Sequence, residues 1–126
     1  MIIETPISVG ELIDKITILR IKSRVIVDPI KLHNVNNELS QLIYTLSNSK
    51  LPDILCEFQS LEDINKELWD IEDNIRIKES KKEFDNEFIE LARAVYITND
   101  KRSELKKDIN LKVGSDLIEE KSYEQY

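Results

Sequence analysis

Hydrophobic residues recur along this chain at alternating steps of three and four, which is the spacing of one face of an α-helix. The clearest run lies in the first half of the chain and consists of Leu32, Val35, Leu39, Leu42 and Leu46. Two further runs follow, one of Phe58, Leu61, Ile64, Leu68, Ile71 and Ile75, and one of Phe88, Leu91, Ala92, Val95, Leu105 and Ile109. Such narrow apolar stripes are typical of the seams between antiparallel helices.

Capping residues and prolines divide the chain into four predicted helices. Ser8 followed by Glu11 forms a capping box, and Asp28 before Pro29 is a typical N-cap with proline in the first turn. Two glycines and three prolines are too few for the turns of a sheet protein of this size. We therefore predict one all-α domain over residues 1–126, an antiparallel bundle with helices at about 9–27, 29–47, 53–78 and 86–112 and a short helix or tail over 113–126.

The helix predicted over 9–27 is apolar on two sides, and this bears on the oligomeric state. One stripe contains Leu12, Ile16, Leu19 and Ile26, and the other contains Ile18, Ile21 and Val25. A helix with two apolar stripes needs two neighbours. A single four-helix chain could provide both, but a second copy would supply the second surface more easily, so we expect a homodimer.

Charge and cysteine content narrow the partners and the compartment. The formal net charge of −7 would repel the phosphates of a nucleic acid and an anionic membrane surface, so we expect neither as a partner. Cys56 is the single cysteine and cannot form an internal disulfide, which favours the reducing cytoplasm. We recognise neither a signal peptide nor an apolar run of the roughly 20 residues that a membrane span needs.

Polar residues interrupt the apolar stripes at two places. Asp14 lies one turn before Ile18 on the second stripe of the first helix, and Arg102 lies with Asn99 on the apolar face of the last helix. A buried carboxylate or guanidinium needs a counter-charge or hydrogen bonds. We predict that Asp14 and Arg102 pair across the core and that Asn99 completes the hydrogen bonds, either as a structural ion pair or as one wall of a small polar pocket.

Two further pairs of residues are candidates for holding a ligand. Lys15 and Arg102 could line a pocket for an anion such as a dicarboxylate, although nothing in their spacing singles this out. Glu67 and Asp70 stand at i and i+3 on one flank of the third helix, and such a pair can hold Mg²⁺ through carboxylate oxygens. The alternative interpretation is that both acids belong to a solvated helix flank.

Three sets of segments are long enough to compare with known families: VGELIDKITILRIK (9–22), ELWDIEDNIR (67–76) with ELARAVYITNDKRSELK (90–106), and LIEEKSYEQY (117–126). Together they resemble the signature segments of an uncharacterised bacterial and phage family of small acidic all-helical domains of unknown function. The resemblance covers most of the chain and implies no activity, so it carries over no catalytic residue. It implies that certain polar residues belong to the family pattern: Asp14, Glu67, Asp70, Asn99, Asp100 and Arg102.

Two functions fit these observations. Narrow seams, a two-sided first helix, an outward-facing Trp69 and the lack of a strong catalytic motif favour a non-catalytic interaction or scaffold module, which needs no cofactor and binds itself or another protein. The alternative is a Mg²⁺-dependent enzyme or ligand-binding bundle that uses Glu67 and Asp70 on a phosphorylated or nucleotide substrate. ELWD (67–70) is similar to the Glu-x-x-Asp motif of all-α nucleotide pyrophosphohydrolases, but EFIE (87–90) follows it, whereas their Glu-x-x-Glu motif lies upstream.

Overall fold

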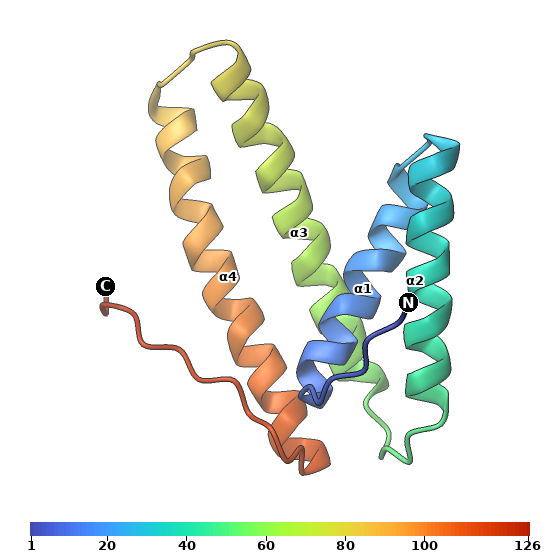
Figure 1. Ribbon diagram of the computed structural model, residues 1–126. Coiled ribbons are helices and arrows are strands. Elements are labelled where there is room, and N and C mark those ends of the chain that lie inside the picture. Colours follow the sequence, from blue (N-terminus) through green and yellow to red (C-terminus); the bar gives the residue numbers. More distant parts are fainter.

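The computed structural model describes residues 1–126 and contains four helices and no strand: α1 (Val9–Val25), α2 (Pro29–Ser47), α3 (Leu55–Ser80) and α4 (Asn86–Val113). They form two antiparallel hairpins, a short α1–α2 and a longer α3–α4, which diverge as the limbs of a V (Figure 1). Helix α1 packs against all three other helices, whereas α2 packs against α1 alone. The predicted all-α bundle of four main helices is confirmed.

Local capping explains where several helices begin and end. The Ser8 hydroxyl accepts a hydrogen bond from the backbone N–H of Glu11 at 3.1 Å, and Asp28 caps α2 with Pro29 in its first turn. Gly114 adopts a left-handed conformation, with φ of 68°, and ends α4. The caps at Ser8 and Asp28 are the ones that the sequence predicts, because each depends only on residues close to it in the chain.

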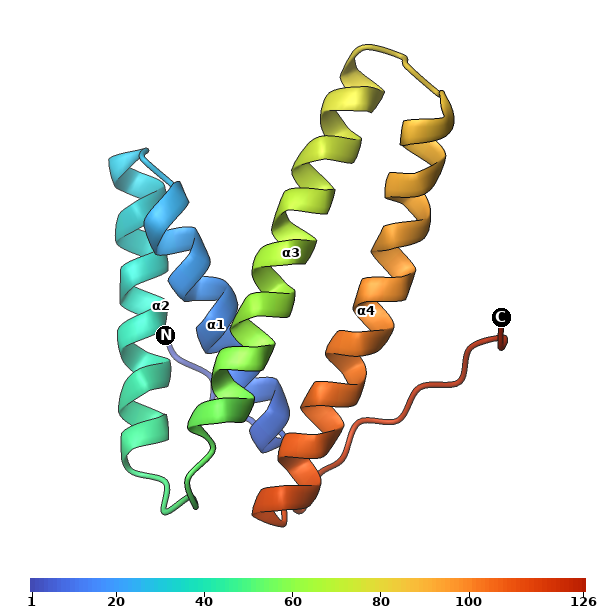
Figure 2. The ribbon, with the colours of Figure 1, turned by 180° about the vertical axis from the view of Figure 1, so that it is seen from behind.

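The helix boundaries differ from the prediction by two residues at the end of α1 and at both ends of α3, which ends at Ser80, and by one residue at the end of α4; the tail is not helical. Helix α1 ends at Val25 because Ile26 is already extended. Helix α3 begins at Leu55, since the Asp53 carboxylate accepts a hydrogen bond from the Leu55 N–H at 3.0 Å and so lies outside the helix. Residues 115–126 form an extended tail, which runs back beside α4 (Figures 1 and 2).

The apolar core is small and lies where α1 meets α3 and α4. Ile13, Leu61 and Ile109 are fully buried against one another, and partly buried residues pack around them. Both apolar sides of α1 are used within one chain, because α2 covers one side and the α3–α4 hairpin covers the other (Figure 2). None of the four helices combines the length and apolar character that crossing a membrane requires.

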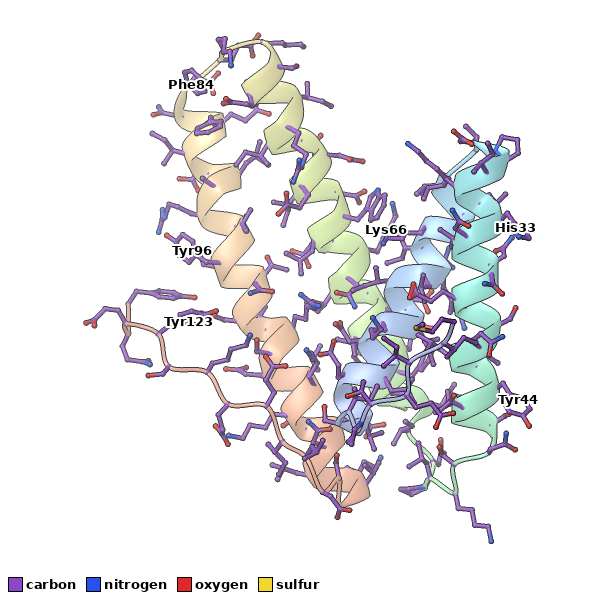
Figure 3. All side chains as sticks on the ribbon, viewed as in Figure 1. His33, Tyr44, Lys66, Phe84, Tyr96 and Tyr123 are labelled. Carbon is purple, nitrogen blue, oxygen red and sulfur yellow. The ribbon has the colours of Figure 1, made fainter.

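The α3–α4 hairpin extends well beyond its contact with α1. We call residues 66–97 the arm, and no residue in this range is buried. Phe84 lies near the tip of the arm and Tyr96 lies lower on α4 (Figure 3). Helices in proteins draw most of their stability from tertiary packing of an apolar face. The arm therefore has only its own two-helix seam for support.

Gly10 allows the first turn of α1 to sit directly on α4. A Cβ at Gly10 would lie 2.5 Å from the backbone oxygen of Lys106, and the Gly10 N–H donates to Asn110 Oδ1 at 2.7 Å. We predict that Gly10→Ala lowers the free energy of unfolding by about 1–3 kcal/mol through overpacking, although alanine is the better helix former. Urea denaturation followed by circular dichroism measures this.

The matched control for Gly10 is Gly114→Ala, since these are the two glycines of the chain. Gly114 has open space around it, so only its left-handed backbone opposes the substitution, at about 1 kcal/mol. A Gly10→Ala protein as stable as the wild type would show that α1 and α4 do not approach this closely.

Candidate functional site

A buried network of polar side chains joins α1, α3 and α4, and we call it the polar junction. Its centre is Asp14, which is only 1% exposed. Arg102 donates from Nε to Asp14 Oδ1 at 2.9 Å and from Nη2 to Oδ2. The predicted pairing of Asp14 with Arg102 is therefore confirmed. The hydrogen bonds with Asp14 raise the pKa of Arg102 above its usual value.

Two asparagines and a threonine complete the hydrogen bonds of this pair. Asn65 of α3 donates from Nδ2 to Asp14 Oδ1 and to Thr17 Oγ1, both at 2.8 Å. Asn99 accepts from Arg102 Nη1 at 3.2 Å, as the sequence predicts. Because both oxygens of the Asp14 carboxylate have partners, it can be buried without the full cost of losing water.

Lys106 extends the junction toward the start of α1 and the tail. Its Nζ lies 2.7 Å from Glu11 Oε2, 3.0 Å from Glu119 Oε2 and 3.9 Å from Asp14 Oδ2. Burial lowers the pKa of Lys106, but its hydrogen bonds to Glu11 and Glu119 outweigh this and raise it. The Glu11 carboxylate thus bonds to α4 in addition to standing in the first turn of its own helix.

Lys15 does not belong to the junction, contrary to the sequence-based expectation. Its side chain is exposed, and the two basic residues at the junction are Arg102 and Lys106. Successive residues on a helix are about 100° apart, so the neighbour of a buried Asp14 points elsewhere. The structure therefore does not bring Lys15 to the junction beside Arg102, and an anion pocket between the two stays a prediction.

Several junction residues were missed by reasoning from sequence. Asn65 stands one turn after Leu61 and one turn before Leu68 on an apolar stripe, which is the same signal that identified Asp14. Lys106 lies three residues before the buried Ile109 on α4, and this spacing also predicts that Lys106 faces the inside of the bundle. Both residues were overlooked because asparagine and lysine are usually exposed to solvent.

Glu67 and Asp70 lie on the exposed side of the arm. Asp70 pairs with Lys66 of its own helix at 3.0 Å, and both acids are exposed. No group of three or more His, Cys, Asp or Glu side chains in the chain is arranged to hold a metal ion. The buried acid of α3 is instead Glu62, whose carboxylate lies 3.0 Å from Arg20 and 2.8 Å from Arg24 of α1.

A cleft of about 520 Å³ lies between α1 and the base of the arm, next to the junction. Its apolar lining consists of Ile18, Leu68, Trp69 and Val95, and its polar lining consists of Asn65, Glu72, Asp73, Arg76, Asn99 and Arg102. The Arg102 side chain is 27% exposed, and three of its five N–H groups bond to Asp14 and Asn99. The other two have no acceptor within the chain.

The tail is attached to α4 by the ends of its side chains. Glu119 pairs with Lys106, and Glu120 lies 3.3 Å from Lys107. The Tyr126 ring meets the Tyr96 ring edge to face, with centroids 5.3 Å apart. Figure 3 shows Tyr123 and Tyr96 on the same side of the molecule. Lys121 and Lys106 bond to Glu119 and lower its pKa to about 2.

The chain belongs to DUF6165, a family of unknown function, whose family model matches residues 2–126. No curated protein and no solved structure matches the chain. The expected resemblance to a family of small domains of unknown function is confirmed, and the match extends over both hairpins, the junction and the tail.

We predict that Arg102→Met lowers the free energy of unfolding by about 3 kcal/mol or more, because it leaves the Asp14 carboxylate buried without its guanidinium. Combining it with Asp14→Leu should cost less than Arg102→Met alone, since no unpaired charge remains. Chemical denaturation of the two single variants and the double variant measures this coupling. Lys15→Met, next to Asp14 but exposed, serves as the control and should change stability by less than about 0.5 kcal/mol. Equal losses for Arg102→Met and Lys15→Met would contradict the buried pair.

We also predict that the tail detaches from α4 in acid. Lys121 of the tail and Lys106 of α4 lower the pKa of Glu119 to about 2, and of these two ion pairs only the one with Lys106 joins the tail to α4. That pair is fully formed above pH 4.5 and is lost as the pH falls from there toward 2. Nuclear magnetic resonance signals of residues 117–126 report the detachment. Glu119→Gln should release the tail already at neutral pH, whereas Glu124→Gln should not. A Glu119 carboxyl that titrates near 4.5, as in a free peptide, would show that the tail is not docked.

Proposed function

We propose that this protein is a non-catalytic interaction module that presents its cleft and arm to a protein partner. The polar junction supports a structural role, because Arg102 and Lys106 already face carboxylates of the same chain. A charge network that is satisfied internally fixes the packing of the helices that it joins. Such a module needs no cofactor, and the exposed free thiol of Cys56 fits the reducing cytoplasm.

The exposed apolar surface of the arm is the observation that carries this proposal. Ile77, Phe84 and Ile89 are each half exposed or more, at 50%, 57% and 51%. Single exposed apolar residues are ordinary, but here they stand on the arm, in which no residue is buried. Exposed apolar side chains on such a sparsely packed segment support a site that another protein covers.

The cleft at the base of the arm has the composition of a protein-binding surface. Trp69 lies beside Leu68 and Val95, with charged and amide side chains around them. Tryptophan and arginine are the residues that most often carry binding energy when a partner excludes water from them. Arg102 adds two N–H groups that are held in place by Asp14 and have no acceptor in the chain. A partner could therefore supply both apolar contact and a hydrogen-bond acceptor.

The junction gives this surface a defined shape. Asp14 and Thr17 belong to α1, Asn65 to α3, and Arg102 to α4, so their hydrogen bonds fix the direction in which the arm leaves α1. Asn65, Asn99 and Arg102 also line the cleft. We infer that these residues act as positioning residues for the binding surface.

The alternative function, a Mg²⁺-dependent enzyme acting on a phosphorylated or nucleotide substrate, has weaker support. It requires Glu67 and Asp70 to act together as metal ligands. Asp70 is paired with Lys66, and no third His, Cys, Asp or Glu joins the two acids. A substrate would have to bind on one exposed face of α3, where no enclosing wall is present.

We predict that a photo-crosslinking amino acid placed at Trp69 captures a protein in cells that express the chain. The same amino acid at His33, on the exposed side of α2, is the matched control and should capture nothing. Adding Leu68→Asp should abolish the adduct at position 69, because a carboxylate would then be buried in the apolar contact. Denaturing gels followed by mass spectrometry detect and identify the adduct.

Either of two results would overturn this proposal. The first is the absence of any adduct at position 69. The second is a rise in melting temperature with Mg²⁺ and a nucleotide or sugar phosphate that is lost in Glu67→Gln and Asp70→Asn, since a bound ligand stabilises the folded state by mass action.

A further inference from the structure

The charges that line the cleft point to the identity of its partner. The chain carries a formal net charge of −7, so two copies repel each other over most of their surfaces. The lining of the cleft contains both acidic and basic residues: Glu72 and Asp73 beside Arg76 and Arg102. A surface that carries both signs can be complementary to itself, which is what a two-fold interface between identical chains requires.

The spacing of these residues on α3 fits such a two-fold interface. Trp69, Asp73 and Arg76 stand at i, i+4 and i+7, which places them on one stripe of the helix. Asp73 has no ion pair within the chain, and the Arg76 side chain is 77% exposed with a 3.3 Å contact to Glu72. If a second α3 lies antiparallel across this stripe, Asp73 of each copy faces Arg76 of the other.

The accessible surface of the chain leaves room for an interface of this kind. It amounts to 8956 Å², whereas a folded monomer of this mass exposes about 7,000 Å². The difference of about 2,000 Å² comes from the extended ends, from α2, which contains no buried residue, and from the arm. A standard interface takes about 800 Å² from each partner, which is less than half of this excess.

Two arms brought together would also give each other the packing that one arm lacks. The seam of the arm is formed by Leu68, Ile71, Ile75, Leu91 and Val95, all of which are only partly buried. Two antiparallel hairpins packed face to face make a four-helix layer, in which seam residues become core. Trp69 lies on the cleft side of this layer. Its large aromatic ring would bury much apolar area against the second copy.

We propose that the cleft and arm bind a second copy of this chain, with α3 antiparallel to α3 and with Asp73 of each copy paired to Arg76 of the other. This rests on the proposed function, because it names the partner of the same surface. The two ion pairs are related by symmetry and lie on either side of the two-fold axis. They set the register of the two arms, while Trp69 and the seam residues supply the apolar contact.

A charge-swap experiment on the full chain tests this pairing. Asp73 and Arg76 are exposed, so Asp73→Lys and Arg76→Glu should both fold with the circular dichroism spectrum of the wild type. Wild-type protein should have the mass of two chains by light scattering at micromolar concentration. Each variant alone places like charges opposite each other twice, and its dissociation constant for the dimer should rise about 100-fold.

Mixing the two variants is the decisive step. In the mixed pair the side chains introduced by Asp73→Lys and Arg76→Glu face each other with opposite charges. At the symmetry-related position the unchanged Arg76 of the first variant faces the unchanged Asp73 of the second, so a dimer containing one copy of each variant should form. A tag on one variant identifies the mixed species. Glu38→Lys changes the net charge as Asp73→Lys does but lies on α2, so it should leave the dimer intact.

The possible failures of this inference differ from those of the proposed function. A wild-type mass of one chain, or an unchanged dimer in both variants, overturns the pairing. If the wild type is a single chain while the crosslinker at position 69 captures a different protein, the interaction function stands and the second copy is wrong. If position 69 captures nothing and the mass is that of one chain, both proposals fail.

Discussion

The burial of one carboxylate, that of Asp14, constrains the arrangement of the whole chain. A buried carboxylate requires a counter-charge and hydrogen bonds, and no single helix can supply them all. Asp14 draws its partners from α3 and α4, through Asn65 and Arg102. The three helices therefore cannot slide or rotate independently without leaving a charge unpaired. Of the seven buried apolar residues five belong to α1, whereas α3 and α4 supply one each, Leu61 and Ile109, so the polar contacts carry much of the register between these helices.

A second polar contact, farther along α1, also holds α1 against α3. Glu62 of α3 is nearly buried and lies between Arg20 and Arg24 of α1. The Arg20 guanidinium also stands over the Phe58 ring at 5.2 Å. Exposed ion pairs contribute little to stability, but here the acid is buried and the arginines cover it, so loss of either arginine would expose a desolvated charge. The α1–α3 contact is thus fixed at two points, about two helical turns apart on α1.

The sequence predicts those features that depend on neighbouring residues or on a single helical periodicity. Ser8, Asp28 and Gly114 cap helices because of their own chemistry, and Asp14 and Arg102 were found because each interrupts an apolar stripe. Asn65 and Lys106 carried the same signal but were overlooked. Lys15 was proposed with Arg102 as an anion pocket although nothing in their spacing singled it out, and its exposed side chain does not belong to the junction. Neither the V between the two hairpins nor the docking of the tail on α4 could be predicted, because both depend on contacts between residues 13 to 106 positions apart.

The division of the molecule into a fixed base and a sparsely packed arm explains why the arm exposes so much of its surface. Near the base, α1, α3 and α4 share the core and the junction, so opening there would break buried hydrogen bonds. In the arm, every residue has some access to solvent, and local opening costs far less because few apolar contacts are lost. A partner that covers the arm would bury the half-exposed seam and stabilise the least stable part of the fold. The junction already fixes the direction of the arm, so a partner would only have to complete the packing of the arm and would not have to orient it. The buried ion pair and the exposed arm are therefore linked through the orientation of α3 and α4.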